Sequence, residues 1–227
     1  MHGETPYIVR AGQEDYKRLF YSDPEIAMKL PITIPGGFGI IKAGTVMAKV
    51  SESTSRLGYY VPYTPETPAA GLTTYPGIAY LVTDGAASTS VYVTMADSYK
   101  FAVGDHLGAS DANTAAASGI DLGAITAIDR TTNSHMALIT VTNNVTTAIT
   151  VAQGGCVWHQ STTSAPFTLA KGILLGSVDT GTGEDCKGAL GTLVKKNAIL
   201  YKGLLAGYDS DALTDLGGAE DGQFLIL

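Results

Sequence analysis

The sequence predicts a mainly β fold, and three observations support this prediction. The chain has 27 glycines in 227 residues, roughly 12% against a usual ~7%. Only 15% of its residues are charged, against a typical ~25%. Short runs rich in Thr, Val and Ile alternate with turn residues, and Val91, Val93 and Met95 are separated by polar neighbours, the period of a strand with one buried face. We therefore expect many short strands joined by tight turns.

The first clear pair of strands lies between residues 45 and 63. Residues 45–50 (TVMAKV) form an apolar run of strand-forming residues, and polar residues 51–56 follow it. Gly58 supplies a turn position, and Pro62 interrupts the second run. We predict a hairpin whose second strand lies at the edge of a sheet.

Residues 1–30 read as an extended N-terminal arm, because apolar side chains are interspersed with polar residues and prolines. Such an arm either folds back on its own domain or docks on a neighbouring subunit. The candidate residues for a capsid or subunit contact are Tyr7, Ile8, Tyr16, Leu19 and Phe20.

The middle of the chain predicts a separate unit. Residues 64–76 carry three prolines and resemble a linker. Strand-like runs then follow at 78–82, 90–95, 120–128, 136–142 and 147–151, with a loop expected at 109–118. Further strands are expected at 172–178, 190–194, 198–205 and 223–227. We expect a discontinuous β-domain from 31–65 plus 156–227, with 70–155 inserted as a second small β-domain.

The strands at 45–50 and 59–63, together with 170–174 and Val178-Asp179, resemble the head decoration (cement) proteins of tailed phages, of the lambda-like type. The resemblance covers roughly 31–65 and 164–205. It implies a small β-barrel or β-tulip-like domain that binds the expanded capsid, with the major capsid protein as partner. It also implies a homo-oligomer, most simply a trimer, without enzymatic activity. The protein would be made in the host cytoplasm and reside on the outer capsid surface of the virion. The long leading segment and the insert depart from the family pattern.

The charge of the chain argues against two kinds of partner. The formal net charge is −7 with a pI near 4.9, and no run of Lys or Arg occurs, so a nucleic-acid-binding face is not expected. No apolar run approaches the ~18 residues of a membrane span, and no signal peptide is expected.

Neither a metal nor another cofactor is predicted. Cys156 and Cys186 are the only cysteines, too few for a disulfide framework, and buried free thiols are the simplest interpretation. Cys156 and His159 have zinc-ligand spacing, but a closed zinc site needs two further ligands. The acidic stretch from Asp209 to Asp221 either binds Ca²⁺ or forms a solvated loop. It is not an EF-hand, because Thr214 stands where that loop needs glycine.

Asp179-Thr180-Gly181 is the sharpest catalytic candidate, because aspartic proteases use an Asp-Thr-Gly motif. Those enzymes need two carboxylates that share a proton, and this chain has one copy, so catalysis would require a homodimer. A turn after a strand explains the motif more simply, since Thr182 follows where those enzymes usually have Ala or Ser. The alternatives to a decoration protein are thus a hydrolase using Asp179, or a surface- or carbohydrate-binding β-module of a tail or fibre.

Overall fold

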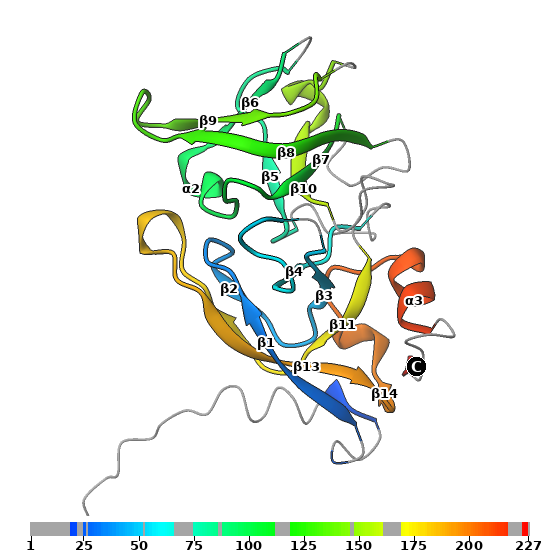
Figure 1. Ribbon diagram of the computed structural model, residues 1–227. Coiled ribbons are helices and arrows are strands. Elements are labelled where there is room, and N and C mark those ends of the chain that lie inside the picture. Colours follow the sequence, from blue (N-terminus) through cyan, green and yellow to red (C-terminus); the bar gives the residue numbers. More distant parts are fainter. Residues whose placement is uncertain are drawn as a thin grey trace, which may run out of the picture.

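A computed structural model of the chain describes residues 19–21, 25, 27–51, 53–65, 75–85, 88–111, 119–145, 148–160, 169–217 and 224–226. The fold is mainly β, as the sequence predicts (Figure 1). Two larger sheets account for most strands, and two short two-stranded ladders accompany them.

The first large sheet joins the two ends of the chain. Across the sheet its strands are β1 (Met28–Ile34), β13 (Ala189–Lys196), β11 (Ala170–Leu174), β3 (Val46–Lys49) and β4 (Tyr60–Pro62). All neighbours are antiparallel. The expected hairpin is confirmed as β3 and β4, and β4 lies at one edge of the sheet, opposite β1. We call residues 19–65 and 169–226 the five-stranded region.

Strand β1 is not predicted by the sequence because Pro31 interrupts its apolar pattern. The structure accommodates this proline because β1 is the outer strand of its sheet, where the amides along one edge need no strand partner. Ile32 and Ile34 on this strand are buried and belong to the core of the five-stranded region.

Shorter elements complete the five-stranded region. They are β2 (Ile40–Ile41) paired with β12 (Val178–Asp179), β14 (Ala198–Leu200) paired in parallel with β15 (Phe224–Ile226), the 3₁₀ turns η2 (Gly183–Asp185) and η3 (Lys202–Leu204), and helix α3 (Ser210–Gly217). The strands expected at 172–178 and 198–205 are therefore shorter than predicted. The first breaks at a bend before β12, and the second ends where the 3₁₀ turn η3 follows.

The second large sheet comes from one continuous stretch of chain. Across the sheet its strands are β5 (Ile78–Tyr80), β10 (Cys156–His159), β7 (His106–Ser110), β8 (Ile120–Asp129), β9 (Met136–Val141) and β6 (Ser90–Thr94). The sheet curls into a half-barrel, and a bridge between Leu81 and Val93 links its first and last strands. We call residues 75–160 the six-stranded region.

The six-stranded region has its own core. The predicted alternation is confirmed from Ser90 to Thr94, where Val91 and Val93 are buried and Tyr92 faces outward, but Met95 is half-buried and begins a helix. Apolar side chains, among them Phe101, Ile125 and Ile139, fill the inside of the half-barrel. The short helix α2 (Met95–Ser98) follows β6, and its first turn is capped by the Thr94 hydroxyl.

Several expected boundaries shift in this region. Strand β10 pairs with β5 and β7, so the expected boundary between 155 and 156 falls at the edge of a strand of the six-stranded sheet. Strand β7 takes in Ala109 and Ser110 from the expected loop. The expected strand at 147–151 is reduced to a bridge between Ile149 and Gly85, and the 3₁₀ turn η1 (Val151–Gln153) follows.

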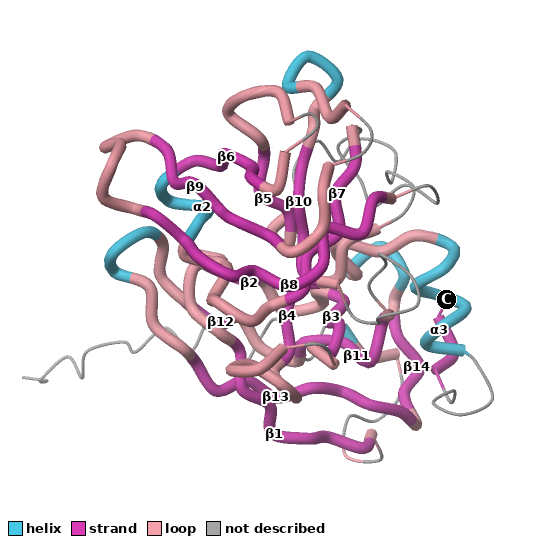
Figure 2. Tube along the Cα trace, turned by 45° about the horizontal axis from the view of Figure 1, so that its top comes forward, coloured by secondary structure: helices cyan, strands magenta, loops and turns pink. Residues whose placement is uncertain are grey.

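The two regions lie against each other, and both views show the six-stranded sheet above the five-stranded one (Figures 1 and 2). The contact uses loops of the five-stranded region. Gly37 packs so closely that an added Cβ would lie 2.6 Å from the Tyr99 carbonyl carbon. Because Gly37 also has a φ of 102°, this close approach depends on glycine.

Candidate functional site

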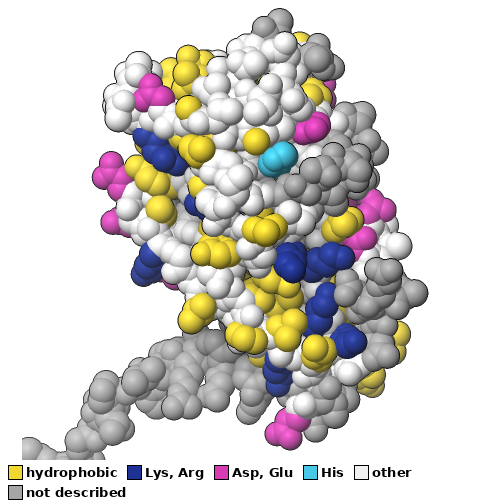
Figure 3. Space-filling view, viewed as in Figure 1, with side chains coloured by type: hydrophobic (Ala, Val, Ile, Leu, Met, Phe, Trp, Pro, Cys, Tyr) yellow, Lys and Arg dark blue, Asp and Glu magenta, His cyan; other side chains and the backbone are white. Residues whose placement is uncertain are grey.

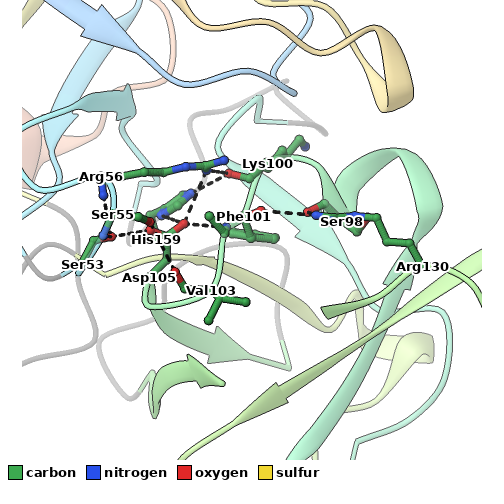
Figure 4. A network of polar contacts seen from close by, with 11 residues as sticks. Ser53, Ser55, Arg56, Ser98, Lys100, Phe101, Val103, Asp105, Arg130 and His159 are labelled. Carbon is green, nitrogen blue, oxygen red and sulfur yellow. Dashed lines mark hydrogen bonds and ion pairs between the residues drawn. The ribbon is translucent and has the colours of Figure 1, made fainter. Parts of the chain in front are cut away.

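A buried cluster of charged and polar side chains lies where the two regions meet (Figure 4). Asp105, immediately before β7, is fully buried at its centre. Ser53 donates a 2.6 Å hydrogen bond to Asp105 Oδ1. The Ala102 amide donates to Oδ2 at 2.8 Å, and Arg56 Nη1 lies 3.4 Å from the same oxygen. Both carboxylate oxygens are therefore partnered, as a buried charge requires.

His159 occupies the end of β10 beside this carboxylate. Its Nε2 lies 2.9 Å from the carbonyl oxygen of Lys100, and because a carbonyl only accepts, Nε2 carries the proton. Its Nδ1 is 3.8 Å from Asp105 Oδ2, which is too long for a hydrogen bond. The ring packs 5.0 Å from Phe101 and 6.2 Å from Phe38, measured between centroids. Burial lowers the pKa of His159, and the nearby Asp105 only opposes this effect, so the imidazole is neutral in the folded protein.

Two cations complete the cluster. Arg56 Nη1 donates to the Lys100 carbonyl oxygen at 2.5 Å. Lys100 Nζ donates to the Ile78 carbonyl at 2.5 Å and pairs with Asp97 at 2.7 Å. Burial lowers the pKa of the Arg56 guanidinium, and Asp105 opposes this shift; arginine nevertheless stays charged. The Arg56–Asp105 pair therefore crosses the boundary between the regions, whereas the Lys100–Asp97 pair lies within the six-stranded region.

Local sequence explains how the loop at 53–56 reaches the cluster. The Ser53 hydroxyl accepts hydrogen bonds from the amides of Ser55 and Arg56, at 3.2 and 2.9 Å, which forms a tight serine turn. The Thr54 amide donates to the Gly104 carbonyl at 3.2 Å. This turn directs the Arg56 side chain toward Asp105.

The arrangement does not provide a nucleophile. A serine, a histidine and an aspartate are close together, but the Ser53 hydroxyl donates to Asp105 and not to an imidazole nitrogen. Asp105 is fully buried and His159 is 3% exposed, which leaves no access for a substrate. We therefore interpret the cluster as a structural clamp between the regions. Sequence reasoning missed it, because residues 51–56 and Gly104-Asp105 signal only turns.

Asp179 stands at the end of β12 in an exposed turn. Its Oδ1 accepts a 2.9 Å hydrogen bond from the Gly181 amide. Thr180 is fully buried, accepts from the Phe38 amide at 3.0 Å and donates to the Gly39 carbonyl at 2.9 Å. Thr180 thus anchors the loop at 36–39, and Asp179 and Gly181 form a turn. This arrangement agrees with the interpretation of the motif as a turn after a strand.

The cysteines occupy different environments. Cys156 is fully buried, and burial raises the pKa of its thiol to about 12. Cys186 is partly exposed, and the two cysteines do not form a disulfide. Residues three apart on a strand point to opposite faces, so Cys156 and His159 on β10 do not converge on one metal ion. Within the described ranges, no group of three or more metal-ligating side chains is found.

The acidic stretch from 209 onward begins a helix. Asp209 Oδ1 accepts from the Ala212 amide at 2.8 Å and from the Tyr63 hydroxyl at 3.0 Å, so it caps the N-terminus of α3. Asp215 Oδ2 accepts from the Ala170 amide at 2.8 Å, and burial raises its pKa. These carboxylates therefore serve packing and capping, whereas Glu220 and Asp221 lie outside the described residues.

The five arm residues divide into two groups. Leu19 and Phe20 are buried in the core of their own chain, where Phe20 bridges Leu200 of β14. Tyr7, Ile8 and Tyr16 lie outside the described residues. A contact of the arm with the capsid or another subunit stays a prediction for these three.

Two open cavities lie on the outer faces of the sheets. The first, which we call the outer cavity, has a volume of about 360 Å³ and is lined by Thr83, Tyr92, Asp129, Thr132, Asn133, Met136 and Leu138. The second, which we call the Leu190 groove, has a volume of about 270 Å³ and is lined by residues 175–178 and 190–192.

Comparison with protein-family models, with curated proteins and with solved structures finds no match to this chain. Among the described helices, none has the length and apolar character needed to cross a membrane.

Proposed function

We propose that this chain is a virion structural protein that binds the outer surface of an expanded phage capsid and stabilises it, without enzymatic activity. One observation carries the proposal. The two separated segments that resemble decoration proteins contribute neighbouring strands of one sheet, since β3 pairs directly with β11 through Val46 with Ile173 and Met47 with Gly172. Segments far apart in the chain thus act as one unit, as the resemblance requires.

The finer architecture belongs to the same proposal. The five-stranded region would be the decoration-type β-domain, of barrel or tulip type, and the six-stranded region would be the inserted domain. Residues 1–18 would form the part of the arm that reaches the shell.

Starting the chain at Lys29 should lower its melting temperature as well as its capsid affinity, because Leu19 and Phe20 belong to the core.

The surface of the five-stranded region offers candidate contacts with the major capsid protein. Leu190 is 81% exposed and Ile40 is 70% exposed, and Leu190 borders the Leu190 groove. On the face seen in Figure 3, apolar side chains gather over this region with Lys and Arg beside them. Large exposed apolar side chains beside a groove are typical of surfaces that bind a protein. Repetition over many subunits would multiply a weak contact.

Two further features follow from the resemblance. We expect a homo-oligomer, with a trimer as the simplest form, because decoration proteins sit on capsid symmetry axes. We also expect the protein on the outer surface of the virion. Neither nucleic acid nor membrane is part of the proposal.

The hydrolase alternative finds no support in the geometry around Asp179. An aspartic protease needs a second carboxylate within sharing distance of the first. Asp179 instead accepts a hydrogen bond from the amide of Gly181 within its own turn. The carbohydrate-binding alternative has a specific observation in its favour, the outer cavity, which is treated below.

The deciding experiment mixes the purified full-length protein with expanded shells built from a major capsid protein encoded in the same genome. Wild-type protein should co-sediment with the shells. Leu190→Glu, which places a charge on the candidate contact, should bind at least tenfold more weakly. Val151→Glu is the matched control, because Val151 is 42% exposed on the six-stranded region. Wild-type protein that stays in the supernatant would refute the proposal.

A further inference from the structure

The outer cavity is formed by a row of side chains across three strands. Tyr92 of β6 pairs with Leu138 of β9, and Leu138 pairs with Asp129 of β8. Directly paired residues of antiparallel strands point to the same face of a sheet. Because their neighbours Val91 and Ile139 fill the inside of the half-barrel, the row faces outward.

The turn between β8 and β9 makes one wall of the cavity. It brings Thr132 and Asn133 over the outer face, while Met136 extends the apolar floor beside Leu138. The Tyr92 side chain lies on the other side, and this residue is 37% exposed. The cavity thus has an aliphatic floor, one aromatic wall and one polar wall.

The polar wall is held in place before any ligand arrives. Asp129 Oδ1 accepts from the Thr131 amide and hydroxyl, both at 2.8 Å, and from the Thr132 amide at 3.1 Å. Asp129 Oδ2 accepts from the Thr132 hydroxyl at 2.5 Å. These hydrogen bonds hold the pKa of Asp129 below its ordinary value, and the one from the Thr132 hydroxyl has the largest effect. The carboxylate is therefore ionised, and Oδ2 keeps capacity for a further donor.

Asn133 supplies the complementary group. Its Oδ1 accepts a 2.9 Å hydrogen bond from the His135 amide, so the group that Asn133 can offer a ligand in this cavity is its Nδ2 donor. The wall therefore offers a fixed acceptor, Asp129, beside a fixed donor, Asn133. The Thr83 hydroxyl can donate or accept, whereas the Thr132 hydroxyl, which already donates to Asp129, can only accept from a ligand.

We propose that the outer cavity binds one neutral sugar unit, with its C–H face against Tyr92 and its hydroxyls bonded to Asp129 and Asn133. A sugar hydroxyl donates and accepts at once, which matches the acceptor and donor side by side in this wall. An aromatic ring face carries negative potential that attracts the C–H groups of a sugar ring. The volume of about 360 Å³ falls within the range of small-molecule sites, roughly 300–1,000 Å³.

The charge of the lining discriminates between ligand classes. Among the described lining residues Asp129 alone is charged, and its negative charge disfavours phosphorylated and sulfated ligands. An ammonium ion could interact favourably with Asp129 and Tyr92. However, it offers no acceptor for the amide N–H groups of Asn133, which would then lie beside a positive charge. The neutral sugar satisfies both groups. This inference goes beyond capsid binding, because the cavity lies on the six-stranded region and the proposed capsid contact on the five-stranded one.

The experiment is an NMR titration of the ¹⁵N-labelled full-length protein. The probes are methyl glycosides of glucose, galactose, mannose and N-acetylglucosamine, each raised to tens of millimolar, and tetramethylammonium chloride. At least one glycoside should shift amide signals of β6, β9 and residues 130–135, and tetramethylammonium should not. Tyr92→Ala should weaken that binding at least tenfold. Tyr201→Ala should leave it unchanged, because Tyr201 is similarly exposed, at 42%, but lies outside the cavity.

A second variant separates the sugar from a cation. Asn133→Asp keeps the acceptor for the His135 amide but replaces the donor with a second negative oxygen, so it should weaken the glycoside at least tenfold. The proposal is overturned if no glycoside shifts these signals in wild-type protein. It is equally overturned if tetramethylammonium shifts them and Asn133→Asp strengthens that binding while leaving the glycosides unaffected.

Discussion

The two regions differ in how the chain builds them and in the surfaces that result. All strands of the six-stranded sheet lie between residues 78 and 159, whereas the five-stranded sheet needs strands from 28–62 and from 170–196. The six-stranded sheet therefore closes through contacts within one stretch of chain. The five-stranded sheet forms only when two distant segments meet, a topology that slows folding.

Their charges differ as well. In the six-stranded region the described lysine and arginine residues are Lys100 and Arg130, and both interact with other side chains of that region. Lys100 pairs with Asp97, while Arg130 donates to Ser98 and lies 4.5 Å from the centre of the Tyr99 ring. The five-stranded region carries exposed lysines, including Lys29, Lys42, Lys49 and Lys187. The two regions thus present differently charged surfaces, and the clamp at Asp105 joins them.

The largest expected effect comes from removing the centre of this clamp. Asp105→Ala leaves Arg56 buried without its carboxylate and removes the acceptor of Ser53 and Ala102. Loss of one partner of a buried ion pair costs about 3–5 kcal/mol, which urea unfolding followed by circular dichroism would measure. Asp111→Ala, at an exposed aspartate, should change stability by less than about 0.5 kcal/mol. A loss below about 1 kcal/mol for Asp105→Ala would show that the regions are joined by other contacts.

Two glycine variants test a second contact between the regions, the one at Gly37. Gly37 and Gly58 both have positive φ, at 102° and 86°, so alanine is strained at either position. Only Gly37 faces the other region, because an added Cβ at Gly58 meets nothing within 4 Å. Gly58→Ala should cost about 1 kcal/mol, and Gly37→Ala about 1–3 kcal/mol more, measured by the same unfolding curves. Equal losses would mean that the regions do not pack closely at Gly37.

The smallest expected effect is a pH dependence from His159. Burial lowers the pKa of His159 below the ordinary histidine value of about 6.5, so below that value the unfolded chain binds a proton that the folded chain does not. The free energy of unfolding should therefore decrease as the pH is lowered, by up to about 1.4 kcal/mol per pH unit between roughly pH 6.5 and 5.5. The measurement is thermal unfolding across this range, comparing wild type with His159→Gln and with His135→Gln at an exposed histidine. The dependence should flatten only in His159→Gln, and an unchanged slope in that variant would exclude His159 as the source.

The sequence predicts strands best where one face is buried. The alternation at 90–94 and the apolar run at 45–50 both appear as strands. Strand β10 escapes prediction because all four of its residues are buried, which removes the alternation. Helix α3 is short and acidic, and its register depends on Asp209 capping and on Ala212 and Leu216 packing inward. The clamp joins Arg56 to Asp105 across 49 positions, and no local pattern reports such a pairing.

The most direct test of capsid binding is a reconstruction of expanded shells decorated with the full-length protein. We expect density for the five-stranded region against the shell, with Leu190 at the contact. We also expect that the six-stranded region points outward and leaves the cavity beside Tyr92 open to solvent. The subunits should surround a symmetry axis. A reconstruction with Tyr92 and Leu138 against the shell, or with isolated subunits away from every symmetry axis, would contradict this division between the two regions.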